Sequence, residues 1–248
     1  MDPRTMPART RRMSRESPVR RHGIARLDRA AFDRDAESLA RMLLGTRLLV
    51  REACGGWSGG RIVETEAYLG GEDLASHSRL GRRTPRTEVM FGPAGVSYVY
   101  LVYGMHHCFN VVAGPLGSGA AVLVRALEPE FGLAPMRSRR PRCGRDEHLA
   151  AGPGRLAAAL GITRDDGGLD LTRSRRIRLE PMADPVADPV ADPRPWPVVR
   201  GPRIGVAFAG AWADAPLRFF LEGHPSVSRS GRRAGGGTSA LPPGRSEE

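Results

Sequence analysis

The chain has 248 residues and a formal net charge of +11 at pH 7, and all 38 of its basic residues are arginine. This length supports one sizeable hydrophobic core, and the charge favours a polyanionic partner such as nucleic acid over a merely basic, solvated surface. The three cysteines are too few and too widely spaced for a disulfide framework or a CxxC metal site, and no run approaches the roughly 18 apolar residues of a membrane span. We therefore expect a soluble, cytoplasmic protein.

The first predicted segments are a disordered arm and a helix. Residues 1–29 hold nine arginines and three acids with almost no apolar periodicity, which predicts a disordered basic arm. A helix is expected over residues 33–45, because Leu39, Met42 and Leu43 recur at helical spacing, acids occupy the first turn and a glycine closes the stretch.

Two strands are expected next, over residues 46–52 and 60–70, and the second contains the letters VETEAY. Side chains alternate along a strand, so Glu64 and Glu66 share a face with Tyr68. Two acids on one face indicate either a sheet edge in water or the wall of a catalytic pocket. They lie about 6.8 Å apart along the strand, a spacing that suits the acid–base pair of an inverting hydrolase. The alternative is that Glu64 pairs with a nearby arginine.

A β-hairpin is expected from the strands over residues 96–104 and 109–114, with Gly104 in the turn and Tyr103 near the tip. An exposed aromatic wedge in an arginine-rich protein suggests insertion into a stacked duplex. A hairpin packed against its neighbour is the alternative, and the pattern alone favours it.

The hairpin also contains three consecutive residues of types that bind metal ions, His106, His107 and Cys108. Neighbouring side chains on a strand point to opposite faces, so these three cannot converge on one ion. We therefore expect no metal site at His106, His107 and Cys108.

The later segments complete an α+β pattern. A strand over residues 120–128 precedes a short helix over residues 152–162, and a strand-like stretch covers residues 203–210. Between them, residues 182–197 repeat ADP every four residues, and proline at that period excludes a helix or a central strand, so we expect a surface loop. Residues 229–248 are expected to form a disordered tail. We therefore expect one domain that covers residues 30–228 and has a largely antiparallel sheet flanked by helices.

Long motifs follow one another in a fixed order along this domain: GRIVETEAYLGGEDLASHSRLGRRTPRTEVMF, the hairpin, VLVRALEP, GPGRLAAALGI and RIGVAFAGAWADAPLRFF. From about Leu39 to Ser228 the chain resembles the alkyladenine (3-methyladenine) DNA glycosylase family. The resemblance implies a curved sheet with a protruding hairpin, and a monomeric repair enzyme without a cofactor. Such an enzyme flips alkylated or deaminated purines (the 3-methyladenine, 7-methylguanine and hypoxanthine class) out of double-stranded DNA and hydrolyses the N-glycosidic bond.

The resemblance also assigns roles to individual residues. Glu66 matches the catalytic carboxylate that activates the attacking water, and Arg125 matches an arginine that organises the water and phosphate beside it. Tyr68 would stack on one face of the extruded base, while His77 and Tyr100 close the other. The remaining matched positions are Ala75 in the base pocket, Asn110, whose side chain clashes with the amino group of guanine, and Tyr103 and Met105, which intercalate into the duplex.

Arginines in the loop after His77 are expected to grip DNA phosphates, with a solvated loop as the alternative; they are Arg79, Arg82, Arg83 and Arg86. The absence of lysine bears on the chemistry, because strand cleavage by a glycosylase normally needs an amine that forms an imine with the sugar. Hydrolysis by water, leaving an abasic site without lyase activity, is therefore expected.

Two other function classes stay open. A non-catalytic module on the same scaffold could bind distorted duplex DNA or RNA, and it would tolerate loss of Glu66. An inverting sugar hydrolase would use Glu64 and Glu66 together, but it would leave the wedge and the arginine excess unexplained. A repair enzyme would associate with the nucleoid if the source is bacterial.

Overall fold

The computed structural model describes residues 26–181 and 196–228. The predicted basic arm up to residue 25, all but the last two residues of the predicted loop over 182–197, and the predicted tail over 229–248 lie outside the described residues. Leu27 is buried in the core, and its N–H donates to the carbonyl of Leu179 at 3.1 Å. The described fold thus begins at Arg26, before the predicted domain boundary at residue 30.

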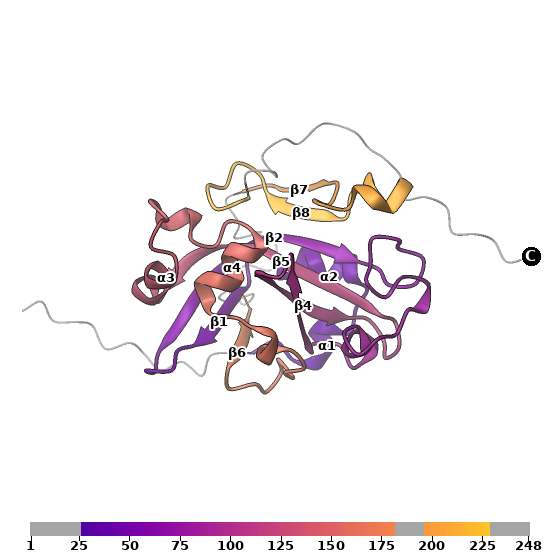
Figure 1. Cartoon of the computed structure of the whole chain (residues 1–248), viewed down its shortest axis with the longest axis horizontal. Coiled ribbons are helices and arrows are strands. Elements are labelled where there is room, and N and C mark those ends of the chain that lie inside the picture. The colour runs from indigo at the N-terminus through magenta and orange to yellow at the C-terminus, as the bar shows by residue number, and fades with distance from the viewer. Residues whose placement is uncertain (1–25, 182–195, 229–248) are drawn as a thin grey trace, which may run out of the picture.

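A single antiparallel sheet organises the described part of the chain (Figure 1). Its main path runs in the order β3-β4-β5-β2-β1-β6, while β8 pairs with a further part of β2 and carries β7 on its other edge. This arrangement confirms the predicted α+β class with an antiparallel sheet. The strands are β1 (Arg47–Arg51), β2 (Trp57–Tyr68), β3 (Ser97–Val102), β4 (His106–Ala113), β5 (Ala120–Phe131), β6 (Ile177–Glu180), β7 (Val198–Gly201) and β8 (Arg218–Leu221).

Strand β2 lies at the centre of the sheet and contributes side chains to both of its faces. It pairs with β5 along one edge, and along the other it pairs first with β1 and then with β8. The register with β5 shifts between Ile62 and Thr65, which bends the strand at this point. Thr65 points to the helical face and donates to the carbonyl of Ala40 at 2.9 Å. By alternation Glu64 and Glu66 point to the opposite face.

The helices are short, and residues that favour helix ends cap α2 and α4. They are α1 (Arg29–Phe32), α2 (Ala36–Leu43), α3 (Leu133–Arg139) and α4 (Pro153–Leu160). The Asp35 carboxylate accepts the Ser38 N–H at 2.8 Å at the start of α2, and Gly161, with φ +62°, ends α4. Both predicted helices are therefore confirmed, with shorter bounds. Within the described ranges, no helix has the length and apolar composition needed to cross a bilayer.

The prediction of a strand over residues 203–210 is wrong. The segment is irregular up to Val206 and then forms a 3₁₀ turn over Ala207–Ala213. The first two residues of this segment make contacts with β2 and the loop after it. The Arg203 side chain turns inward to Asp73, and the Ile204 N–H donates to Glu66. The Ile204 N–H is therefore not free to join a strand ladder, and β8 pairs with β2 at Glu64–Glu66 instead.

Candidate active site

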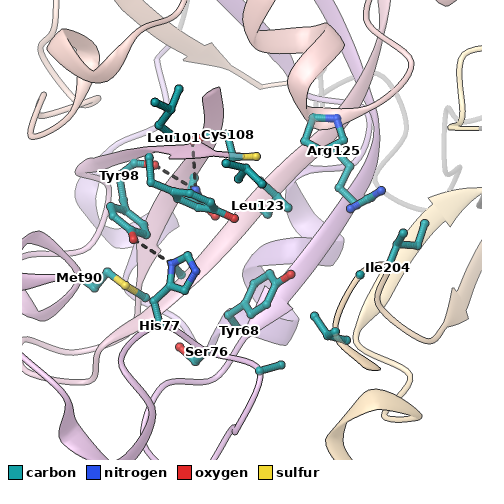
Figure 2. Close-up of a pocket in the computed structure, with 18 of the residues that line it drawn as sticks. Tyr68, Ser76, His77, Met90, Tyr98, Leu101, Cys108, Leu123, Arg125 and Ile204 are labelled. Atoms are coloured by element: carbon teal, nitrogen blue, oxygen red, sulfur yellow. Dashed lines mark hydrogen bonds between the residues drawn. The ribbon is translucent and has the colours of Figure 1, made fainter. Parts of the chain in front are cut away.

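A cavity of about 550 Å³ lies on the face of the sheet opposite α2, and its volume is in the usual range for small-molecule sites. Side chains from β2, β3, β4 and β5 line one side, and residues 204–208 line the other (Figure 2). Pro153, at the start of α4, also lines the cavity. Most of the residues expected in the site meet here: Tyr68, Ala75, His77, Arg86, Tyr100, Tyr103, Asn110 and Arg125.

Glu66 does not itself line the cavity but lies directly behind its wall. The side chain has no exposed surface. One carboxylate oxygen accepts the Ile204 N–H at 2.8 Å and lies 3.2 Å from Arg125 Nη1, and the other accepts the Tyr68 hydroxyl at 2.9 Å. All three of these neighbours line the cavity. The carboxylate is thus fixed in orientation at the point where the two sides of the cavity meet.

Arg125 bridges the two buried acids of β2. Its Nε donates to Glu64 at 3.0 Å, and the charges of Glu66 and Glu64 together raise the pKa of Arg125 despite its burial. Glu64 also accepts the N–H and hydroxyl of Ser228, at 2.9 and 3.0 Å, and the guanidinium of Arg218 at 3.4 Å. The expectation that Glu64 pairs with arginine is confirmed. Glu64 is therefore held by these partners and is not free to act with Glu66 as the acid–base pair of an inverting hydrolase.

Three aromatic rings form a cage across the cavity from Tyr68. The His77 and Tyr100 rings meet edge to face with centroids 4.6 Å apart, and the Tyr98 and Tyr100 centroids are 5.3 Å apart. His77 Nδ1 and the Tyr98 hydroxyl share a hydrogen bond of 2.9 Å, drawn as a dashed line in Figure 2. Tyr68 and this cage line the same cavity, and aromatic side chains favour contact with a flat ring.

His77 is neutral in this cage. Burial, followed by the charges of Arg86 and Arg79, lowers the pKa of His77 to about 4. The guanidinium of Arg86 donates to the imidazole at 2.9 Å from Nε2, and a ring nitrogen can accept only when the imidazole is neutral. The neutral imidazole therefore adds no positive charge of its own to that of the Arg86 guanidinium beside it.

The arginines of the basic loop differ in what their side chains contact. Arg86 braces the cage, because it also lies 3.3 Å from the Tyr98 hydroxyl and 4.9 Å from the Tyr100 centroid. Arg83 pairs with Glu88 at 2.7 Å. Arg82 is exposed, and the guanidinium of Arg79 makes a long hydrogen bond of 3.4 Å to the carbonyl of Ser76. Phosphate binding by Arg79 and Arg82 stays a prediction, and Arg86 has a structural task besides any contact with DNA.

Asn110 forms a fixed part of the cavity wall on β4. Its side chain is almost fully buried, and its Nδ2 donates to the carbonyl of Tyr98 at 3.0 Å and to that of Cys108 at 3.4 Å. These bonds hold the carboxamide in one orientation. Asn110 therefore cannot swing away from the cavity wall without breaking these two hydrogen bonds.

Three residues, Tyr103 to Met105, connect β3 to β4 at the tip of the hairpin. Tyr103 and Gly104 both have positive φ, of +51° and +70°, and the Met105 N–H donates to the Val102 carbonyl at 3.1 Å, as in a type I′ turn. Tyr103 is 87% exposed and Met105 is 70% exposed. The packed-hairpin interpretation is therefore wrong for Tyr103, whose ring projects at the cavity mouth.

Comparison with known proteins places this arrangement in a family. The family model of methylpurine-DNA glycosylase matches residues 30–225, a span that contains every candidate residue named above for the cavity and the hairpin. The chain belongs to this family.

Relatives of the methylpurine-DNA glycosylase family match most of the chain. A protein of Myxococcus xanthus is 48% identical over 210 residues, covering 84% of this chain and 97% of its own length. The DNA-3-methyladenine glycosylase of Mus musculus is 45% identical over 211 residues, which is 82% of this chain and 61% of the mouse protein. The DNA-3-methyladenine glycosylase of Homo sapiens is 42% identical over 238 residues, covering 92% of this chain and 76% of the human protein.

Two residues outside the sequence-based assignment hold this glycosylase-family site together. Arg203 and Asp73 are both fully buried and form a bidentate pair with N–O distances of 2.5 and 2.8 Å. The Arg203 guanidinium lies 4.8 Å from the centroid of the Tyr68 ring, and Asp73 accepts the Ala75 N–H at 3.0 Å. We call this pair the Asp73–Arg203 clamp. It joins the loop that carries Ala75 to the segment that carries Ile204, 130 residues further along the chain.

Sequence reasoning also gave no role to Tyr98, although the alternation along β3 places it on the same face as Tyr100. That signal could have identified it as part of the cage. As for metal, no group of three His, Cys, Asp or Glu side chains in residues 26–181 and 196–228 is arranged to hold an ion. His106 and His107 lie opposite Val102 and Leu101 in the hairpin.

Proposed function

We propose that the chain is a DNA glycosylase that excises alkylated purines, 3-methyladenine first among them, from double-stranded DNA. A single observation carries the proposal: a buried carboxylate, Glu66, is held by three hydrogen-bonding or ion-pairing neighbours directly behind an aromatic cavity large enough for a purine. Membership of the methylpurine-DNA glycosylase family and the names of the mouse and human relatives support it.

The cavity would receive a base turned out of the helix. Extrusion costs a few kcal/mol of lost stacking and pairing. Stacking on an aromatic side chain contributes about 1–3 kcal/mol per base, so Tyr68 on one side and His77 with Tyr100 on the other can offset much of this cost. Tyr103, which lines the cavity and is exposed at the hairpin tip, would fill the gap left in the duplex, and the exposed Met105 beside it would intercalate as well.

Hydrolysis at the sugar would then use Glu66 as general base. The bond from C1′ to the purine nitrogen breaks with its electron pair going to the base, and the sugar passes through an oxocarbenium-like state. Water attacks C1′ while its proton passes to the Glu66 carboxylate, whose negative charge also stabilises the developing cation. Arg125 keeps Glu66 in place and keeps the pair of acids on β2 from repelling each other.

The product is an intact strand with an abasic site, since the chain has no lysine to form an imine with the sugar. An alkylated purine that carries positive charge leaves readily as a neutral base. 7-Methylguanine and hypoxanthine belong to the proposed substrate class, with Asn110 screening against ordinary guanine. Because one cavity serves one extruded base, we propose that a monomer binds one duplex.

The test is incubation with duplex oligonucleotides that carry a single lesion. Free base should appear with the strand intact, and the strand should break at the lesion only after alkaline treatment. Strand cleavage without alkali would contradict the monofunctional assignment. Tight binding without any release of base would favour the non-catalytic DNA- or RNA-binding module.

A further inference from the structure

Phe208 is a large apolar side chain left exposed at the mouth of the cavity. It lines the cavity opening and is 69% exposed, although a phenylalanine of this kind is normally buried. It belongs to none of the hydrophobic clusters of the described fold. Large apolar side chains that remain exposed beside a binding site commonly mark a contact surface.

The backbone on both sides of Phe208 is fixed, so its exposure does not come from a loosely held loop. Upstream, the Ile204 N–H is bonded to Glu66 and Arg203 is held in the Asp73–Arg203 clamp. Downstream, Ala209 is fully buried, and its N–H donates to the Val206 carbonyl at 2.9 Å. The fold therefore presents the ring outward from a rigid turn.

Phe208 and Tyr103 approach the opening from different parts of the fold. Tyr103 belongs to the β3–β4 hairpin, and Phe208 belongs to the segment of Ile204, which faces the hairpin strands across Tyr68 in Figure 2. Both side chains line the cavity and both are exposed, so a DNA strand whose nucleotide enters the cavity comes within reach of them.

We propose that Phe208 is a second apolar DNA contact, which packs against the sugar and base face of the nucleotide next to the extruded one on the lesion strand. This proposal rests on the proposed function. A phenyl ring has neither charge nor hydrogen-bond donors, so phosphate is a poor partner for it, whereas sugar carbons and base faces suit it. Tyr103 would fill the vacated stack while Phe208 supports the displaced strand.

The test measures binding of the full chain to a duplex with a tetrahydrofuran abasic analogue, which needs no glycosidic chemistry. We expect Phe208→Ala to raise Kd about tenfold, within the range for loss of an aromatic–base contact. Phe208→Tyr should stay within about twofold of the parent, because it keeps the ring. Leu116→Ala is the matched control, because Leu116 is 75% exposed but does not line the cavity, and it should leave Kd unchanged.

Two further readouts separate this role from a general effect. The slope of log Kd against log salt should be the same for Phe208→Ala and the parent, because an apolar contact releases no counterions. The single-turnover rate of base release at saturating enzyme should also change less than about twofold, because the ring touches no reacting atom.

Some results would overturn the proposal. Equal Kd values for Phe208→Ala and the parent would remove the contact, and so would an equal loss in Leu116→Ala. A parent dimer in size-exclusion chromatography that Phe208→Ala converts to a monomer would assign the ring to a second copy of the chain. Failure of the proposed function would look different, since a parent that releases no base could still show the Phe208 dependence of binding.

Discussion

The backbone N–H of Ile204 donates to the Glu66 carboxylate at 2.8 Å, although the two residues are 138 positions apart in the chain. This bond couples the central strand of the sheet to the opposite wall of the cavity. The carboxylate is accordingly held from both sides: by Tyr68 and Arg125 from the sheet, and by Ile204 from across the cavity. The position of the proposed general base thus depends on tertiary contacts as well as on its own strand.

Replacing Glu66 by glutamine tests the general base most directly. Glutamine has nearly the same shape and can still accept the Ile204 N–H, but it cannot take a proton from water. We expect Glu66→Gln to lower the single-turnover rate of base release by about 10²–10⁴-fold while Kd for lesion DNA changes less than about threefold. Glu88→Gln is the control, because Glu88 is exposed and forms a surface ion pair with Arg83. Comparable rates for Glu66→Gln and the parent would contradict the assignment.

Sequence patterns could predict the parts of this site that depend on local periodicity. The two-residue repeat of β2 correctly places Glu64 and Glu66 on one face, and the hairpin and both helices follow from similar patterns. The same patterns failed for residues 203–210, an apolar, glycine-containing stretch that is typical of a strand. There, a buried ion pair and one hydrogen bond to Glu66 outweigh strand propensity.

The contacts that side chains make were harder to predict than the strands. Asp73 and Arg203 gave no signal, since each is an ordinary charged residue until the fold brings them together across 130 positions. Arg86 looked like its neighbours in a basic loop, yet its guanidinium contacts the cage. The exposure of Tyr103 was not predictable either, because alternation gives the direction of a side chain and not what covers it.

The Asp73–Arg203 clamp should be essential for stability. Asp73→Asn leaves a fully buried guanidinium without its counter-charge, and breaking a buried pair in this way typically costs about 3–5 kcal/mol. We expect a large drop in Tm and a loss of base release that exceeds the loss of folded protein, because Ile204 and Ala75 shift together. Circular dichroism and single-turnover assays at a temperature where the variant is folded measure the two effects.

The control for the clamp is a pair of the same chemistry on the surface. Asp146 and Arg137 form a close ion pair in which both side chains are more than 40% exposed. Exposed pairs contribute little, so Asp146→Asn should leave Tm and base release at their parent values. If Asp73→Asn were equally harmless, the clamp would have no role in holding the site.

Tyr103→Ala tests the wedge at the hairpin tip. The ring makes no core contact, so the variant should fold with an unchanged Tm. Loss of the intercalating ring should reduce excision of a lesion paired in duplex DNA by roughly tenfold or more, since a stacked aromatic contributes about 1–3 kcal/mol. Excision from single-stranded DNA, where no stack has to be filled, should change far less. An equal loss on both substrates would argue against a wedge.

The neutral state of His77 predicts a specific loss of stability in acid. Its pKa is about 4 in the folded protein and about 6.5 when unfolded, so between these values the unfolded chain binds more protons. Stability should therefore be complete above about pH 6.5 and should fall as the pH drops towards 4, by about 2–3 kcal/mol from this residue. Urea unfolding at a series of pH values measures this effect. His77→Gln keeps a polar partner for Tyr98 but cannot titrate, so the difference in stability between parent and variant should shrink or reverse across this window. Unfolding free energies of the parent and His77→Gln that run parallel across this window would mean that folding does not change how strongly His77 binds a proton.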